Sequence, residues 1–129
     1  MVAADTNVIV RFLTRDDPAQ AGRAASLLSS RQVWISKTVL LETAWVLQSL
    51  YGFTATEVNE ALRGFAGLRN VRLEDPMQVA KAFEWTALDI DFADALHLAS
   101  SAGTNRFLTF DRKFARRAKK LTGVHVAAL

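Results

Sequence analysis

The sequence contains no cysteine and no long uninterrupted run of apolar residues. The first absence excludes disulfide bonds, a thiol nucleophile and a zinc site built on cysteine. The second excludes a transmembrane helix, since polar residues such as Glu42 interrupt the apolar runs well before they could cross a bilayer. No basic and then apolar signal segment follows Met1. We therefore expect a cytoplasmic protein with no membrane contact.

The residues that are present are typical of one globular domain. The chain has 129 residues, of which 50% are hydrophobic and 22% are charged. This length is that of a single domain, and this composition excludes disordered and fibrous proteins. No internal repeat and no linker divides the chain. We predict one domain over residues 1–129.

The positive charge is concentrated near the carboxyl terminus. The chain has 16 basic and 13 acidic residues, for a net charge of +3. Six of the basic residues fall within nine positions: Arg112, Lys113, Arg116, Arg117, Lys119 and Lys120. Such a run is ordinarily the solvated face of a helix, but beside a group of carboxylates it can also hold the phosphates of a polyanion.

Short apolar stretches recur along the chain between longer segments with helix signals. The first starts at Val2 and ends at Asp5, and further strands are predicted at 33–35, 71–73, 106–110 and 124–126. This alternation predicts an α/β fold, a three-layer α/β/α domain with a mostly parallel five-stranded sheet. The first strand is short and apolar, as expected of a buried central strand that is covered on both faces.

The helix signals between these strands are specific. Asp17-Pro18 and Asp75-Pro76 each place a capping acid before a proline at the first helical position. Thr54 and Glu57 have the spacing of a capping box, and Gly103 predicts a helix end. The predicted helices cover residues 7–14, 18–30, 36–50, 54–67, 75–88, 91–103 and 112–120.

Four acidic residues occupy positions that a parallel sheet would bring together. Asp5 and Asp111 each end a predicted strand, while Glu42 and Asp94 lie in helices that follow on the same side, so the four converge on one rim. The helix around Glu42 is apolar nearly all round, which predicts a buried carboxylate unless an arginine pairs with it or the register leaves it exposed. Each of the three aspartates, taken singly, is also explained as a helix cap or a partner of the helix dipole.

Four neighbouring carboxylates repel one another unless a cation or protons offset their charge. Oxygen ligands without cysteine, and without a well-placed pair of histidines, favour Mg²⁺ or Mn²⁺ over zinc or copper. A cation of this kind can activate a water molecule and neutralise the charge that builds on a phosphodiester. The acids therefore indicate metal-dependent phosphodiester chemistry.

Other polar residues near the acids have two explanations each. Thr6, Asn7 and Thr109 could orient waters or carboxylates from behind the ligands, or could be ordinary polar residues at strand ends. Asp91 shares a helical face with Asp94 and is also a natural N-cap. His97 follows one turn later, where a hydrogen-bonded core or edge residue is more common than a catalytic one.

These motifs together resemble the PIN-domain ribonucleases over essentially the whole chain, and most of all the VapC toxins of bacterial toxin–antitoxin pairs. The resemblance rests on Asp5-Thr6-Asn7, Glu42, the segment 91–99 and Thr109-Phe110-Asp111. It implies a metal-dependent endoribonuclease, a homodimer, and a cognate antitoxin protein that blocks the site. The metal-binding and catalytic residues that it implies are Asp5, Glu42, Asp94 and Asp111, with Asp91 as an additional candidate ligand.

RNA is then the polyanion that the basic segment would meet. Because this segment starts beside Asp111, we expect four of its side chains to bind the RNA backbone. They are Arg112, Lys113, Arg116 and Arg117.

Two other functions fit part of the pattern. A phosphoacceptor signalling domain also gathers acids at strand ends, but it has no use for Glu42 and Asp94 inside helices, and no lysine ends the last predicted strand. A catalytically silent metal- or RNA-binding module would keep the same acids for stability. A metal-induced rise in melting temperature without RNA cleavage would favour that module.

Overall fold

The computed structural model describes residues 1–129 and confirms an α/β fold with seven helices and parallel strands. The strands are β1 (Val2–Ala3), β2 (Val33–Ile35), β3 (Val71–Leu73), β4 (Phe107–Thr109) and β5 (Val126–Ala128). The helices are α1 (Thr6–Thr14), α2 (Pro18–Ser30), α3 (Lys37–Tyr51), α4 (Ala55–Ala66), α5 (Pro76–Ala87), α6 (Phe92–Ser100) and α7 (Arg112–Thr122). The predicted alternation of strands and helices is confirmed.

Capping side chains begin most helices where the sequence predicts. At the start of α2, Asp17 accepts a hydrogen bond from the Gln20 N–H at 3.1 Å. At the start of α4, Thr54 and Glu57 form the predicted capping box with reciprocal bonds of 2.9 and 3.1 Å. Local chemistry is enough to define these helix starts.

One predicted cap and several element boundaries differ from the predictions. Asp75 precedes α5 in a left-handed conformation, with φ 45°, and makes no capping bond. Its carboxylate instead pairs with Lys37 Nζ at 2.9 Å, because α3 brings that ammonium beside it. α6 ends at Ser100, before the predicted stop at Gly103, and β5 begins later than predicted, at Val126, because its pairing with β4 sets its register.

The five strands form two parallel sheets rather than the single five-stranded sheet that the sequence suggests. One sheet has the order β1-β2-β3, and the other pairs β4 with β5. β1 is therefore an edge strand with Ala3 exposed, and the prediction of a buried central strand is wrong for this arrangement. The physical reason is that nothing pairs with the outer side of β1, because β4 pairs elsewhere.

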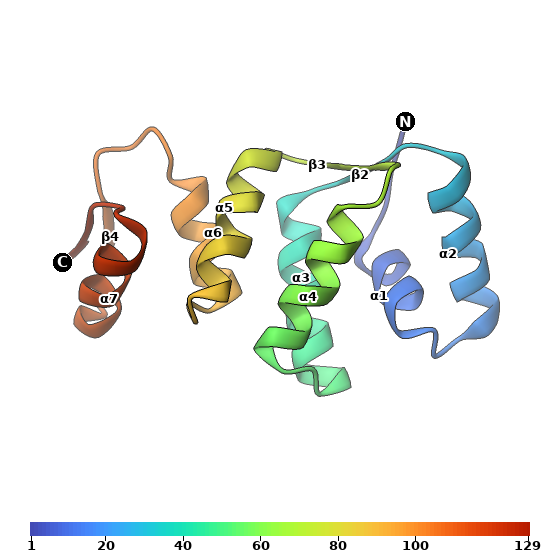
Figure 1. The fold of residues 1–129 in the computed structure, drawn as a ribbon, viewed down its shortest axis with the longest axis horizontal. Coiled ribbons are helices and arrows are strands. Elements are labelled where there is room, and N and C mark those ends of the chain that lie inside the picture. The colour runs from blue at the N-terminus through green and yellow to red at the C-terminus, as the bar shows by residue number, and fades with distance from the viewer.

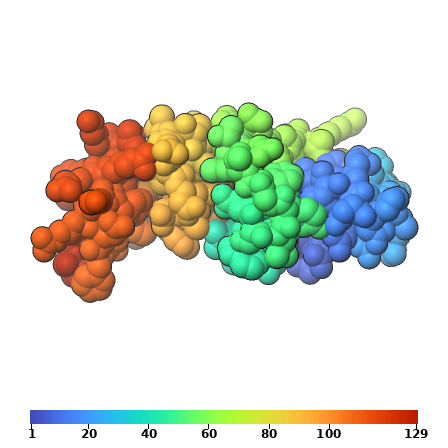
Figure 2. All heavy atoms as spheres, turned by 90° about the horizontal axis from the view of Figure 1, so that it is seen from below, coloured from blue at the N-terminus to red at the C-terminus, as the bar shows by residue number.

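The elements are arranged in a row that follows the chain. Figure 1 shows α1 and α2 at one end, α3 and α4 in the middle, α5 and α6 next, and α7 with β4 at the other end. Figure 2, seen from a second direction, shows the same progression from the amino-terminal to the carboxyl-terminal colours. The expected three layers around one sheet are therefore not formed, and β4 lies far from β1.

One core of buried apolar side chains runs through this row. Leu40 of α3 and Leu98 of α6 belong to it, and so do Ala118 of α7 and Val126 of β5. The carboxyl-terminal elements are thus packed against the rest of the chain rather than detached from it. None of the helices has both the length and the apolar character that a membrane crossing requires.

Candidate active site

Asp5 stands where β1 ends and α1 begins. Its Oδ1 accepts a hydrogen bond from the Thr6 N–H at 2.7 Å, so it caps α1. The residue is exposed, which leaves its carboxylate accessible. The sequence offers two roles for Asp5, a helix cap and an accessible acid at a strand end. In the structure Asp5 has both positions at once.

Glu42 is linked to the end of β1 through a hydroxyl group. The Oγ1 of the buried Thr6 donates a hydrogen bond to Glu42 Oε1. Glu42 itself is exposed, so the prediction of a buried carboxylate is wrong. The register of α3 explains this, because Leu40 and Ala44 face the core and a residue midway between them points to the opposite side of the helix. We call Asp5 and Glu42 the first acidic pair.

Asp91 and Asp94 stand together at the start of α6. Asp91 Oδ2 accepts hydrogen bonds from the N–H groups of Ala93 at 3.1 Å and Asp94 at 3.4 Å, which makes it the N-cap. Asp94 is half-buried. Burial raises the pKa of Asp94, the negative charges of Asp91 and, more weakly, of Asp111 raise it further, and the charge of the exposed His97 lowers it.

Asp111 joins this group from the start of α7. Its Oδ1 accepts a hydrogen bond from the Phe114 N–H at 2.9 Å, and its own N–H donates to Thr109 Oγ1 at 3.1 Å. Asp111 is among the charges that raise the pKa of Asp94, whereas neither member of the first acidic pair is. We call Asp91, Asp94 and Asp111 the second acidic group.

A groove lies between the two sets of acids. It has a volume of about 500 Å³, runs between α3 and α6, and is lined by Glu42 and Asp91. Trp45 and Phe92 supply part of its apolar wall, and Trp45 is 61% exposed. The groove therefore offers carboxylates and an open aromatic surface to the same ligand.

Nowhere do three histidine or acidic side chains lie close enough together to hold a metal ion. The expected rim of four acids is therefore not formed by this chain. The reason is the strand pairing, since Asp111 follows β4, and β4 lies beside β5 instead of beside the strand that ends at Asp5. Mg²⁺ and Mn²⁺ take several oxygen ligands at once, and in this structure no three of the acids lie at one position.

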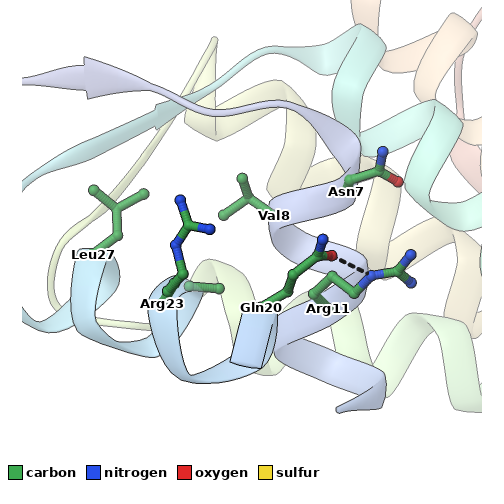
Figure 3. A pocket seen from close by; sticks show the side chains of 7 residues that line it. Asn7, Val8, Arg11, Gln20, Arg23 and Leu27 are labelled. Carbon is green, nitrogen blue, oxygen red and sulfur yellow. Dashed lines mark hydrogen bonds between the residues drawn. The ribbon is translucent and has the colours of Figure 1, made fainter. Parts of the chain in front are cut away.

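A second cavity, of about 400 Å³, lies between α1 and α2 (Figure 3). Asn7 lines it together with Arg11 and Arg23, rather than pairing with the acids. Arg11 donates to Gln20 Oε1 at 2.8 Å and to the Tyr51 hydroxyl at 3.0 Å, while Arg23 is exposed. Sequence reasoning missed these arginines because each is isolated in the chain, and only the packing of two helices brings them together.

The basic residues of α7 are all exposed. Arg112, Arg116 and Lys119 line a groove between α7 and β5, as their spacing along one helical face requires. Arg117 differs, because it pairs with Asp89 at 3.3 Å. Exposed ion pairs are weak, so this one is no barrier to an incoming phosphate. The predicted cationic surface is thus present and open.

The structure is thus an α/β protein with parallel strands, acidic residues at strand ends and helix starts, and one exposed basic helix. The family model of the PIN domain matches residues 2–120. The chain therefore belongs to the PIN domain family, as its acidic motifs predict. PIN domains are generally metal-dependent nucleases. No curated protein matches the chain.

Proposed function

We propose that the chain is an endoribonuclease that hydrolyses RNA phosphodiesters with Mg²⁺ or Mn²⁺ as its cofactor. The residues that would hold the cation are Asp5, Glu42, Asp94 and Asp111, with Asp91 beside them. Membership of the PIN family carries this proposal, together with the groove that Glu42 and Asp91 line. Thr6 supports the assignment of Glu42, because its hydroxyl holds that carboxylate near the end of β1.

The charges of the molecule support an RNA substrate. The acids repel a phosphate unless a cation offsets them. Burial first, and then the negative charges of Asp91 and Asp111, raise the pKa of Asp94. α7 supplies the opposite charge, with Arg112, Lys113 and Arg116 exposed. Contacts of this kind bind the backbone without reading its bases, so α7 would supply affinity and the acidic groove would supply the chemistry.

We propose in addition that this nuclease is the toxin of a type II toxin–antitoxin pair, that it forms a homodimer, and that a cognate antitoxin protein inhibits it. The support is the resemblance of residues 5–7, 91–99 and 109–111 to the VapC toxins. Induced expression of the chain should arrest bacterial growth, and Asp94→Asn should abolish the arrest. Equal arrest by both proteins would contradict a toxic nuclease activity.

A catalytically silent RNA-binding module is the second candidate. One observation favours it: a single chain does not bring three acids close enough together to hold a metal ion. Such a module would bind RNA through α7 and leave it intact. Binding without cleavage in both Mg²⁺ and Mn²⁺ would be its signature.

Cleavage of end-labelled cellular RNA tests the proposal. The purified chain should cut RNA in Mg²⁺ or Mn²⁺ and lose this activity in chelator. Asp94→Asn should be inactive, while Glu84→Gln, which removes one exposed charge from α5, should cut as the wild type does. Cleavage that survives both chelator and Asp94→Asn would sink the assignment.

A further inference from the structure

A further cavity, of about 490 Å³, lies at the amino ends of β4 and β5. α5, the end of α6 and the loop of residues 101–106 line it, and Figure 1 shows this loop leading from α6 to β4. The second acidic group stands at the opposite ends of α6 and β4, so the cavity is separate from the acids. Its volume is that of a pocket for a small ligand. We call it the amino-end cavity.

The wall of the amino-end cavity is apolar and partly aromatic. Trp85 and Leu98 line it from α5 and α6, and both are buried. Phe107 and Val124 line it from the starts of the two strands and are half-buried. Aromatic and apolar side chains of this kind hold the face of an unstacked nucleobase.

The other side chains of the cavity are cationic or polar. Lys81, Arg106 and His125 line it and are exposed, and no acidic residue does so. Arg106 and His125 are neighbours, because the Phe107 N–H donates to the His125 carbonyl at 2.9 Å. Neither takes part in an ion pair, while Lys81 has only an exposed pair with Glu84. The charge of the cavity is therefore complementary to an anion.

An amide stands beside these cations. Asn105 lines the cavity and is exposed, and its side chain can both donate and accept hydrogen bonds. Amides of this kind recognise the polar edges of bases. An apolar wall, an amide and a cationic rim together fit a ligand that has a planar ring and a phosphate, which is a nucleotide.

A cationic groove connects this cavity with the acids. The groove between α7 and β5 contains Arg112 at its start, next to Asp111, and Lys119 near its end. His125 lines both this groove and the amino-end cavity. α7 has 11 residues and is thus about 16 Å long. A chain of phosphates along α7 would therefore pass from the acids to the cavity without meeting a carboxylate in the groove.

We propose that the amino-end cavity binds one base of a single-stranded RNA whose backbone follows α7, with the adjacent phosphate on Arg106 and His125. This inference rests on the proposed function. A free mononucleotide has the same chemistry, but the continuous groove favours a nucleotide within a strand. Double-stranded RNA does not fit, because its bases are stacked and cannot enter a cavity. The cavity would then select a base that lies a few nucleotides from the cut.

RNA affinity of two variants tests this proposal. Fluorescence anisotropy is measured with a labelled single strand of about ten nucleotides, in chelator so that the strand stays intact. Arg106→Ala should weaken binding about tenfold and lower the slope of log affinity against log salt by about 0.7. Ala102→Trp fills the cavity from its exposed rim and should weaken binding about tenfold without changing the slope.

Two controls make the assignment specific. Arg31→Ala removes an exposed arginine that lines neither the groove nor the cavity, and it should bind as the wild type does. The second control is a strand of the same length without bases. Ala102→Trp should bind this abasic strand as the wild type does, which would also show that the variant is folded, while Arg106→Ala should bind it more weakly.

Three results would overturn the proposal. The first is unchanged RNA affinity in both variants, and the second is an equal loss of RNA and abasic strand by Ala102→Trp. The third is uridine or adenosine monophosphate binding that depends on Arg106 and that RNA does not displace, because this would mean a site for a free nucleotide.

RNA cleavage by the wild type in Mg²⁺ or Mn²⁺ is measured separately. Both expected losses of affinity without cleavage would support the cavity and reject the nuclease. Cleavage together with unchanged affinities would support the nuclease and reject the cavity.

Discussion

Residues 1–106, which we call the body, and residues 107–129, which we call the carboxyl-terminal unit, are built in different ways. The body buries large side chains completely, and Leu40 and Leu47 of α3 are both 0% exposed. The unit buries mainly small ones, such as Ala115 and Ala118, and exposes every cation of α7. Burial of apolar area is the main stabilising contribution to folding. The comparison indicates that the body supplies most of the buried apolar area, while the unit adds small side chains to the same core and presents its cations to solvent.

The largest difference between the two parts should be in the free energy of unfolding that each loses when one of its leucines is truncated. Leu47→Ala leaves a cavity in the body and should lower the free energy of unfolding by about 2–5 kcal/mol. Leu121→Ala removes a half-buried side chain of the unit and should cost about 1 kcal/mol. Urea unfolding measures both. Equal losses would show that the unit is held as firmly as the body.

The salt dependence of RNA binding should change when cations of the unit are removed, and should not change when Arg63 and Arg69 of the body are removed. Arg112→Ala with Arg116→Ala removes two exposed cations of the unit, so the slope of log affinity against log salt should fall by about 1.4, or 0.7 per single-stranded contact. Arg63→Ala with Arg69→Ala removes two exposed cations of the body and should leave the slope unchanged. Fluorescence anisotropy over a salt series gives both slopes. Equal changes would mean that RNA does not prefer α7.

The pH dependence of stability should show a smaller effect, at the place where the two parts meet. The pKa of Asp94 is raised in the folded protein by burial and by the charges of Asp91 and Asp111. Folded Asp94 thus keeps its proton at pH values where the unfolded chain has lost it, so stability falls as pH rises from the unfolded to the folded pKa. Asp94→Asn should therefore melt higher than the wild type above that window and equally below it.

A second variant checks the cause of this pH effect. Asp91→Asn keeps a side chain that can cap α6 but removes the neighbouring charge. It should bring the pKa of Asp94 closer to its ordinary value, so that stability falls over a narrower pH range. Melting temperatures measured over a pH series in metal-free buffer would show this. An unchanged pH range would mean that the charge of Asp91 does not raise the pKa of Asp94.

Local features of this fold could be predicted because their causes are local. The capping box of Thr54 and Glu57 and the cap at Asp17 depend on residues within one helical turn, and both formed as expected. The family was also predictable, since the acids that mark it keep their order along the chain. Asp75 failed as a cap because Lys37, from another helix, competes for its carboxylate.

The partner of each strand could not be predicted, because pairing depends on segments far apart in sequence. An apolar β1 is compatible both with the centre of a sheet and with its edge, where the structure places it. The exposure of Glu42 depends in the same way on which side of α3 the other helices cover. Arg11 and Arg23 became neighbours only when α1 packed against α2.

RNA cleavage by single acidic variants is the most direct test of the central claim, that the acids of both sets serve one nuclease. Asp5→Asn and Asp111→Asn each remove one acid and should each be inactive in RNA cleavage. Glu84→Gln, which removes an exposed carboxylate of α5, should cleave RNA as the wild type does. Cleavage that survives both Asp5→Asn and Asp111→Asn would contradict the claim.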